Sequence, residues 1–313
     1  MIAPNNISAK DQFGAYASRL EDIRLFSKVI RNWHQVVLFR AGLRQSVTVM
    51  LRSGRRVELR SKSDYTKFFG SLEFQKELLA AQGIRANMSV KNGIATIGYK
   101  GKLLKFVHSP GLNELPSIVD QFAKEEYKSL SVKGRDVLDV GASIGDSSMY
   151  FALNGARHVY AFEPYPHPFS VARKNISANR LSAKITVINE GLGKPGFVRL
   201  AHEENTVGMP VTESKSGKRT RINSLKDIAD RYDLKDAALK IDCEGCEYPI
   251  ILDADENTLR RFSSIMIEYH YGYANLASKL KSAGFSVEQT KPRLMPGPNG
   301  WWMHMGMITA RKD

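Results

Sequence analysis

Apolar residues in the first part of the chain recur at spacings that indicate a helix followed by hairpins. Over residues 10–42 they stand three and four positions apart, which is typical of a helix with one buried face. Residues 46–60 alternate around a Ser-Gly pair, and residues 87–108 contain two further turn signals, one Asn-Gly and one Lys-Gly. We therefore expect residues 1–112 to form a small α+β domain.

From residue 113 the pattern changes to apolar strands that alternate with helical segments. The predicted helices cover residues 115–130, 146–154 and 167–179, and the predicted strands cover residues 136–140, 157–162, 185–189, 238–242, 264–269, 284–290 and 303–310. This alternation indicates βαβ units and a largely parallel sheet, so we expect residues 113–313 to form an α/β domain. The polar, turn-rich residues 194–221 predict strands and a loop inserted over that sheet.

Composition places the chain among ordinary globular proteins. It has 313 residues, of which 42% are hydrophobic and 25% are charged. We expect no transmembrane segment, because no apolar run approaches the roughly 20 residues that a membrane helix needs. The first residues lack the apolar segment of a secretory signal, and 2 cysteines do not make a disulfide framework. We therefore expect a soluble, cytoplasmic protein.

The positive charge is concentrated in the first third of the chain. The formal net charge is +14, and residues 1–115 hold 19 Lys and Arg against 8 Asp and Glu. The remaining residues hold 27 against 24. This asymmetry favours an anionic partner such as nucleic acid, a phosphorylated small molecule or a membrane surface. The alternative is that the charge serves solubility alone.

A glycine-containing turn, "DVLDVGASIGD", follows the strand predicted at 136–140. Gly141 permits a tight turn, and Gly145 lets the next helix pack closely. In a dinucleotide site a middle glycine makes room for the pyrophosphate, but here Ser143 stands at that position. The turn therefore favours an adenosine ligand without phosphates, such as S-adenosylmethionine, over NAD. Glu163 ends the next strand, where a carboxylate can accept hydrogen bonds from both ribose hydroxyls.

Acidic residues gather after a second apolar strand, in "LKIDCEGCEYPIIL". Asp242 and Glu244 lie at its end, and Glu268 and His270 end a neighbouring strand. Because carboxyl ends of parallel strands meet at one edge of a sheet, we expect these side chains in one cleft. A hydroxyl that accepts a methyl group needs a base as its proton leaves, and these four residues are the candidate catalytic groups.

Two alternative roles for the acidic residues stay open. The carboxylates could bind a divalent ion such as Mg²⁺, which we do not favour, so we assign no metal ligands. They could also be purely structural. Cys243 and Cys246 form a C-x-x-C motif, but a zinc site would need two further ligands, so we expect both side chains simply to pack.

Three ordered blocks of the chain resemble the FkbM family of S-adenosylmethionine-dependent methyltransferases. They are the glycine turn with its "FEP", the "KIDCEGCE" stretch and "SIMIEYH", within roughly residues 115–312. The resemblance implies a Rossmann-like, seven-stranded methyltransferase sheet whose last strand is antiparallel. It also implies O-methylation of hydroxyl groups on sugars or natural products. The residues that it assigns to the cofactor are Asp139, Gly141 and Gly145 at the turn, Glu163 at the ribose, and Asn189 and Glu190 near the adenine. We add Ala142 and Ser143, which lie between the two glycines, to the predicted cofactor-binding residues.

Three functions compete on these observations. The first is an S-adenosylmethionine-dependent O-methyltransferase that acts on a sugar or another small molecule. The second is an RNA methyltransferase that docks tRNA or rRNA through the basic region 1–112. The third is a non-catalytic protein that binds S-adenosylmethionine, which would not need the acidic residues beside the methyl donor.

Overall fold

The computed structural model describes residues 11, 15, 21, 23–108, 114–200, 217–296 and 302–312. The chain divides into two compact units, one of Ala17–Glu126 and one of Tyr127–Asp313 with Met1–Tyr16. The domain boundary expected between residues 112 and 113 stays a prediction. Within the described part, no helix combines the length and the apolar character that crossing a membrane requires.

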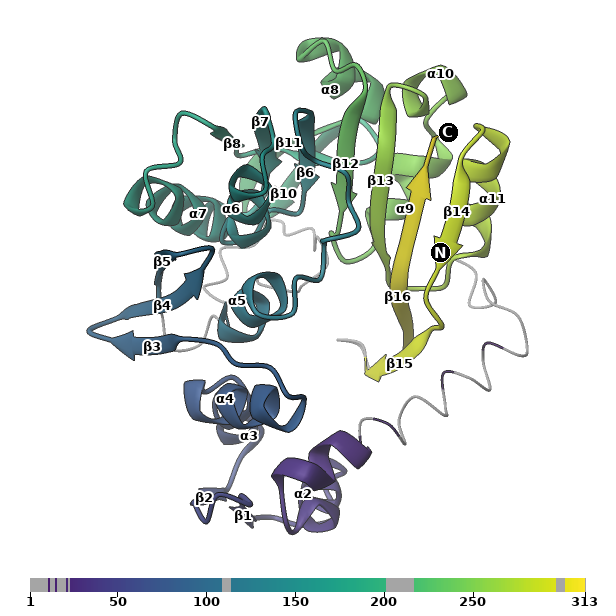
Figure 1. The fold of residues 1–313 in the computed structure, drawn as a ribbon. Coiled ribbons are helices and arrows are strands. Elements are labelled where there is room, and N and C mark those ends of the chain that lie inside the picture. Colours follow the sequence, from purple (N-terminus) through teal and green to yellow (C-terminus); the bar gives the residue numbers. More distant parts are fainter. Residues whose placement is uncertain are drawn as a thin grey trace. The chain divides into compact units, whose positions relative to one another are not determined.

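The unit Ala17–Glu126 combines short helices with antiparallel strands (Figure 1). Its elements are α2 (Trp33–Arg40), β1 (Val47–Met50), β2 (Arg56–Leu59), α3 (Lys62–Phe69), α4 (Leu72–Ala81), β3 (Met88–Lys91), β4 (Ile94–Tyr99), β5 (Lys102–Val107) and α5 (Glu114–Phe122). The strands form the hairpin β1-β2 and the sheet β3-β4-β5. Both predicted hairpin regions are therefore confirmed. In the second, Asn92 and Gly93 at one turn and Lys100 and Gly101 at the other all have positive φ, as the tightest hairpin turns require.

Asn32 interrupts the helix expected over residues 10–42. Residues 23–29 are helical, and α2 follows as a separate helix. The Asn32 amide instead bonds the backbone of β1, where it donates to the Thr48 carbonyl (2.8 Å) and accepts from the Met50 amide (2.9 Å). Part of the predicted helix, before residue 23, lies outside the described residues.

The unit that contains Tyr127–Asp313 is built on one large, mostly parallel sheet. Its strands are β6 (Asp136–Val140), β7 (His158–Phe162), β8 (Ile185–Ile188), β9 (Gly191–Leu192), β10 (Gly196–Leu200), β11 (Lys218–Asn223), β12 (Ala237–Ile241), β13 (Phe262–Tyr269), β14 (Ser286–Gln289), β15 (Arg293–Pro296) and β16 (Trp302–Arg311). Its helices are α6 (Asp146–Leu153), α7 (Pro166–Ala178), α8 (Leu225–Arg231), α9 (Glu247–Leu252), α10 (Glu256–Leu259) and α11 (Ala274–Ser282).

The strand order in the main sheet is β14-β16-β13-β12-β6-β7-β8, and β15 pairs with β16 outside this path. Neighbours from β13 to β8 are parallel, whereas β16 is antiparallel to both β13 and β14. The predicted α/β fold, with seven strands in one sheet and an antiparallel last strand, is therefore confirmed. The strands predicted within residues 194–221 correspond to β10 and β11, which form a separate three-stranded sheet with β9 in the order β10-β11-β9. Residues 201–216 between β10 and β11 lie outside the described residues.

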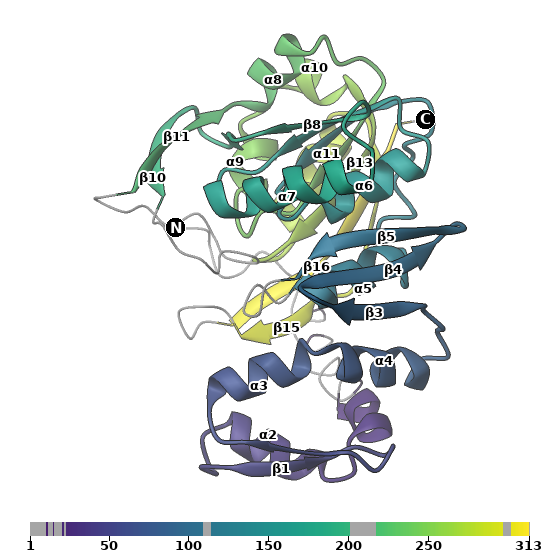
Figure 2. The same cartoon turned by 90° about the vertical axis from the view of Figure 1, so that its left-hand side faces the viewer.

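Helices cover both faces of the main sheet. In Figure 2, α6 and α7 lie in front of the strands, and α9 and α11 lie behind them. The β10-β11 hairpin projects beyond the edge of the sheet in the same view. The helix predicted at 115–130 is wrong in length, because α5 ends at Phe122 and Glu125 adopts a positive φ that no helix continues through.

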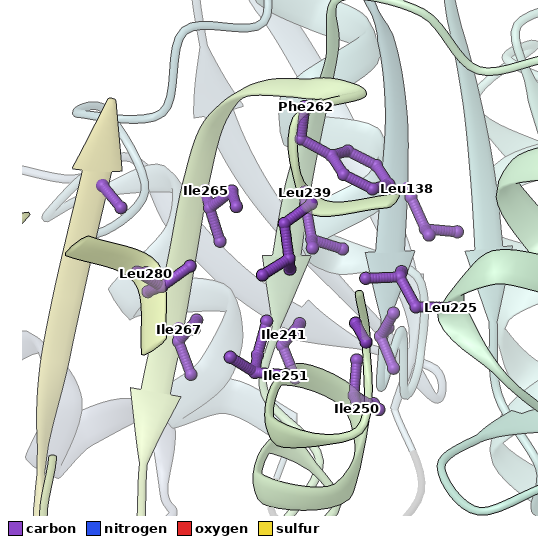
Figure 3. Packing of buried hydrophobic residues seen from close by; sticks show 14 of the residues in the cluster. Leu138, Leu225, Leu239, Ile241, Ile250, Ile251, Phe262, Ile265, Ile267 and Leu280 are labelled. Carbon is purple, nitrogen blue, oxygen red and sulfur yellow. The ribbon is translucent and has the colours of Figure 1, made fainter. Parts of the chain in front are cut away.

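One face of the sheet packs against α8, α9 and α11 through a single apolar cluster (Figure 3). The cluster joins Leu138 of β6, Leu239 and Ile241 of β12 and Ile265 and Ile267 of β13 to Leu225 of α8, Ile250 and Ile251 of α9 and Leu280 of α11. Burying a side chain of this size contributes roughly 1.5–3 kcal/mol. This packing fixes the three central strands on which the site is built.

Residues between these apolar positions face the other way, because successive side chains of a strand point to opposite faces. They are Asp139 in β6, Lys240 in β12 and Glu268 in β13. The parallel register pairs Lys240 directly with Asp139. A polar row therefore runs across three central strands towards their carboxyl ends.

Candidate active site

The glycine turn lies between β6 and α6 and closes on the neighbouring strand. The amides of Gly141 and Ala142 both donate to the Phe162 carbonyl at 3.0 Å, and the Gly145 amide donates to the Ala142 carbonyl at 2.7 Å. Gly141, Ser143 and Gly145 all have positive φ. The alternating left-handed residues give the compact turn that the sequence predicted.

Close approach of two backbones explains Gly141. A Cβ at this position would lie 1.8 Å from the Asp242 carbonyl oxygen. The glycine turn and the acidic strand end are therefore in direct backbone contact. Gly145 serves packing, as predicted, because a Cβ there would lie 3.3 Å from Ala172 Cβ and 3.2 Å from Ile176 Cδ1, both in α7.

Glu163, just after β7, fastens the turn from the other side. Its carboxylate accepts from the backbone amides of Ser143 (2.9 Å) and Tyr165 (2.8 Å). Burial raises the pKa of Glu163 to about 7, although the hydrogen bonds from Tyr165 and Ser143 act in the opposite direction. The Ser143 hydroxyl is buried and has no hydrogen-bond partner among the described residues. A carboxylate and a hydroxyl are thus available together at the turn.

Asp139 supports the turn from beneath. It is fully buried, and its Oδ2 accepts from the hydroxyls of Ser147 (2.7 Å) and Ser148 (2.5 Å) in α6. Its Oδ1 lies 3.2 Å from Lys240 Nζ. With both oxygens engaged inside the protein, Asp139 is placed to hold the turn rather than to contact a ligand directly.

Asn189 and Glu190, expected near the adenine, have different surroundings. Asn189 donates to the carbonyls of Glu163 (3.0 Å) and Pro164 (2.9 Å), so it braces the backbone beside the ribose candidate. Glu190 is held by Arg231 at 2.7 Å and by Asn223 at 2.8 Å. The adenine assignment of Asn189 stays a prediction, and the Glu190 carboxylate forms an ion pair with Arg231.

The candidate catalytic residues come together as the sequence predicted. Asp242 follows β12, Glu268 lies near the end of β13, and His270 follows β13. One ligand-capable atom from each of these three residues lies within 4.8 Å of the other two. Glu244 joins them, because its carboxylate lies 3.2 Å from His270 Nε2.

Glu247 holds His270 in place. This carboxylate is fully buried, and Oε1 accepts from the His270 backbone amide (3.1 Å) and contacts the ring Nδ1 (3.0 Å). Its Oε2 accepts from the Gly245 amide at 2.8 Å. Burial lowers the pKa of His270, but Glu244 and Glu247 outweigh that effect and raise it well above its usual value. In this state the ring is a charged imidazolium held between the carboxylates of Glu244 and Glu247.

Two further groups position Asp242, and sequence reasoning did not identify them. The Tyr127 hydroxyl donates to Asp242 Oδ2 at 3.0 Å, and Lys240 Nζ lies 3.8 Å from the same atom. Burial lowers the pKa of Lys240, but Asp139, Asp242 and Asp146 outweigh it, so the pKa is raised and the ammonium stays charged. A lysine inside the apolar strand "AALKI" was a usable signal, whereas nothing in the sequence links Tyr127 to a residue 115 positions away.

The expectation that the two cysteines merely pack is wrong. Cys243 and Cys246 form a disulfide, so no free cysteine remains. The bond closes residues 243–246, which include Glu244 and lie between Asp242 and Glu247. The sequence spacing allows this pairing, but the two interpretations compared were a zinc site and simple packing, and neither includes a disulfide.

A known protein domain matches this part of the chain. The methyltransferase FkbM domain matches residues 139–287, which include the glycine turn and all four candidate catalytic residues. The chain contains an FkbM methyltransferase domain. The family suggested by the three sequence blocks is therefore confirmed.

One curated protein is similar to this chain over a short stretch of sequence. Ribosomal protein L11 methyltransferase from Carboxydothermus hydrogenoformans is 48% identical over 59 residues. The match spans 19% of this chain and 19% of that protein, so the chain corresponds to about a fifth of its curated relative's length.

Two solved structures that are similar to this chain are a methyltransferase FkbM and a protein in complex with AdoMet. FkbM from Methylobacillus flagellatus is 15% identical with a TM-score of 0.39, and the match covers 63% of this chain and 54% of that one. TYW2 from M. jannaschii, solved with AdoMet, is 17% identical with a TM-score of 0.38, and the match covers 72% and 89%. These scores carry no conclusion about what the FkbM-domain chain binds or methylates.

Proposed function

We propose that this chain is an S-adenosylmethionine-dependent methyltransferase that methylates a hydroxyl oxygen of a sugar or another small molecule. The observation that carries the proposal is the contact between the two halves of the site. A Cβ on Gly141 would lie only 1.8 Å from the Asp242 carbonyl oxygen, so the candidate ligand-binding turn and the acidic strand end are adjacent. A methyl donor held at the turn is thereby adjacent to groups that can accept a proton.

The turn suits S-adenosylmethionine. The buried Ser143 hydroxyl has no partner among the described residues, and its side chain takes space that a pyrophosphate would need. Glu163 can accept bonds from the ribose hydroxyls, because each carboxylate oxygen has more than one acceptor site. When bound, S-adenosylmethionine supplies a methyl group on a positively charged sulfur, so an oxygen–carbon bond forms as the carbon–sulfur bond breaks.

The cluster of acidic side chains at the ends of β12 and β13 supplies a base for the proton of the acceptor hydroxyl. A sugar hydroxyl is a weak nucleophile, and a base that removes its proton as the new bond forms contributes roughly 10²–10⁴-fold. Asp242 and Glu268 are the two carboxylates in the group of three residues that also contains His270. The backbone of Asp242 also contacts the glycine turn. Lys240 and Tyr127 orient Asp242, and Glu247 orients His270, so the chain itself fixes the position of the reacting groups.

The experiment is transfer of a labelled methyl group from S-adenosylmethionine to a panel of hydroxyl-bearing small molecules. We expect Asp242→Asn and Glu268→Gln to lower turnover about 100-fold or more while binding of S-adenosylhomocysteine is kept. Glu288→Gln, an exposed carboxylate on β14, is the matched control and should have no effect. Normal turnover in both site variants would rule out the proposed mechanism. Cofactor binding without transfer to any acceptor would favour the non-catalytic alternative.

RNA is the second candidate acceptor, and a specific observation favours it. Arg52, Arg55, Arg56 and Arg60 lie on or beside the β1-β2 hairpin and are all exposed. Some of this charge is already paired, since Arg60 lies 2.9 Å from Glu58 and Arg55 lies 3.8 Å from Glu73. A cluster of this kind can track a phosphate backbone, so tRNA or rRNA belongs in the acceptor panel.

A further inference from the structure

The acidic cluster has a feature that proton transfer alone does not require. Its two carboxylates and one imidazole come from adjacent parallel strands, and their ligand-capable atoms lie within 4.8 Å of one another. Glu268 and His270 are two positions apart, so an extended backbone turns both side chains the same way. Asp242 reaches the same point from the end of β12.

His270 is oriented as metal-binding histidines are. Its Nδ1 contacts the buried Glu247 carboxylate at 3.0 Å, which leaves Nε2 as the nitrogen that faces the cluster. The side chain is fully buried, and Nε2 has no hydrogen-bond partner of suitable geometry among the described residues. Its near neighbour is the Glu244 carboxylate at 3.2 Å. A carboxylate behind one ring nitrogen is the usual support for a histidine that binds a metal, and a cation at Nε2 would displace the proton that Nε2 shares with Glu244.

Asp242 likewise has an oxygen left for a ligand. Its contacts with Tyr127 and Lys240 both go to Oδ2, so neither of them occupies Oδ1. Lys240 offsets the charge of Asp242 and Asp139 from beneath. Glu244, Glu247 and Glu268 add three more carboxylates around or beside the imidazole. Carboxylates gathered around a buried imidazole are expensive to keep unless a cation offsets their charge.

We propose that Asp242, Glu268 and His270 together bind one divalent cation. Two carboxylate oxygens and one imidazole nitrogen on one side of the ion suit a first-row ion such as Mn²⁺ and leave its other side open. This inference rests on the proposed function, in which the open side receives the acceptor hydroxyl. A hydroxyl bound there loses its proton more readily, and Glu244, a neighbouring carboxylate that is not one of the three ligands, accepts that proton. Asp242 and Glu268 then act by holding the cation rather than as direct bases.

The test is titration of the full-length, EDTA-treated protein with Mn²⁺ alone, followed by the electron paramagnetic resonance signal of free Mn²⁺. We expect one Mn²⁺ per chain, with affinity lowered about tenfold or more by Asp242→Asn and by Glu268→Gln. Glu288→Gln should bind as the unchanged protein does. His270→Ala is a poor probe, because it would leave the buried Glu247 carboxylate without its partner.

The outcomes separate this inference from the function on which it rests. No saturable Mn²⁺ binding, or equal binding in all variants, overturns the cation site. If S-adenosylhomocysteine still binds to the same sample, the proposed function stands in that case. Absence of cofactor binding and of methyl transfer would instead defeat the proposed function, whatever the Mn²⁺ titration shows.

Discussion

At the scale of single residues, Glu163 is the proposed ribose-binding group, and its burial affects its protonation. It is 6% exposed, and burial raises its pKa to about 7 from 4.5. Ribose hydroxyls that donate to this carboxylate favour its ionised form. Ligand binding should therefore be coupled to loss of a proton from Glu163.

We predict that S-adenosylhomocysteine binds more weakly as the pH falls through about 7. Glu163→Gln should remove that pH dependence and weaken binding at pH 8 by roughly 10- to 100-fold, the value of a hydrogen bond to a charged group. Calorimetric titration across the pH range measures both effects. An unchanged affinity in Glu163→Gln would show that this carboxylate does not hold the ribose.

The stability of the ligand-free protein provides a control with a defined sign. Because the pKa of Glu163 is raised in the folded state, its contribution to the free energy of unfolding is fully present below 4.5 and is lost as the pH rises through about 7. The full effect is on the order of 3 kcal/mol. Glu163→Gln should therefore gain stability relative to the unchanged protein as the pH rises from about 5 to about 8.

Gly141 gives a second test at this scale. Gly141→Ala would place a Cβ 1.8 Å from the Asp242 carbonyl oxygen, and the backbone there cannot move without shifting the acidic cluster. We expect a free energy of unfolding lowered by at least about 2 kcal/mol, together with loss of cofactor binding.

Gly284→Ala is the matched control for Gly141→Ala. Its φ is also positive (91°), but nothing lies within 4 Å of the added Cβ. It should therefore show only the backbone strain of about 1 kcal/mol. Equal effects of the two substitutions would mean that the contact with Asp242 is not what requires glycine.

At the scale of elements, the sequence predicted best where a strand is buried on both faces. Every residue of β6 and β12 is buried, and β6 begins and ends where expected. The helix predicted at 115–130 failed because apolar residues such as Tyr127 and Leu130 continue the spacing, although they pack from irregular backbone after α5. α3 and α4 were missed, although Ser61 and Ser71 cap them in the usual way.

Contacts between distant segments set the limit of prediction for the site. The order of strands brought Asp242, Glu268 and His270 together, because parallel strands end at one edge. The buried hydrogen bonds of Asp139 and the ion pair of Glu190 depend on partners that sequence spacing does not specify. Tyr127 is the clearest case, since its hydroxyl donates a hydrogen bond to Asp242, which is distant in the sequence.

The loop between β12 and α9 gives a prediction at this scale. The Cys243–Cys246 disulfide closes a loop in which Glu244 and Gly245 have positive φ, so it limits the backbone freedom of the acidic residues. We expect no titratable thiol in the unreduced, denatured protein and two after reduction. The paired change Cys243→Ser with Cys246→Ser should lower methyl transfer several-fold. Two free thiols before reduction would contradict the observed bond.

At the scale of the whole molecule, the two units differ in charge and in the chemistry they carry. The candidate catalytic residues and the cofactor turn all belong to the unit that contains Tyr127–Asp313. The exposed arginines of the β1-β2 hairpin belong to Ala17–Glu126. The acceptor therefore decides whether that basic surface takes part in function.

Salt dependence distinguishes the two acceptor classes. A protein that neutralises several phosphates loses affinity by roughly 10³-fold or more between about 50 and 200 mM salt, whereas a neutral sugar acceptor is nearly indifferent. We predict little effect of salt on methyl transfer to the small-molecule acceptor. The RNA alternative would be favoured if tRNA binding weakens steeply as salt rises and Arg55→Gln and Arg56→Gln make that salt dependence less steep. The control Lys281→Gln on α11 should leave it unchanged.

Cofactor identity is the claim on which every further part of the account depends. Calorimetric titration of the protein with S-adenosylhomocysteine, with NAD as the control, tests it most directly. The account predicts saturable binding of S-adenosylhomocysteine at one site and no binding of NAD, because Ser143 stands where a pyrophosphate needs glycine. Binding of NAD without S-adenosylhomocysteine would contradict the proposed function and leave only the fold.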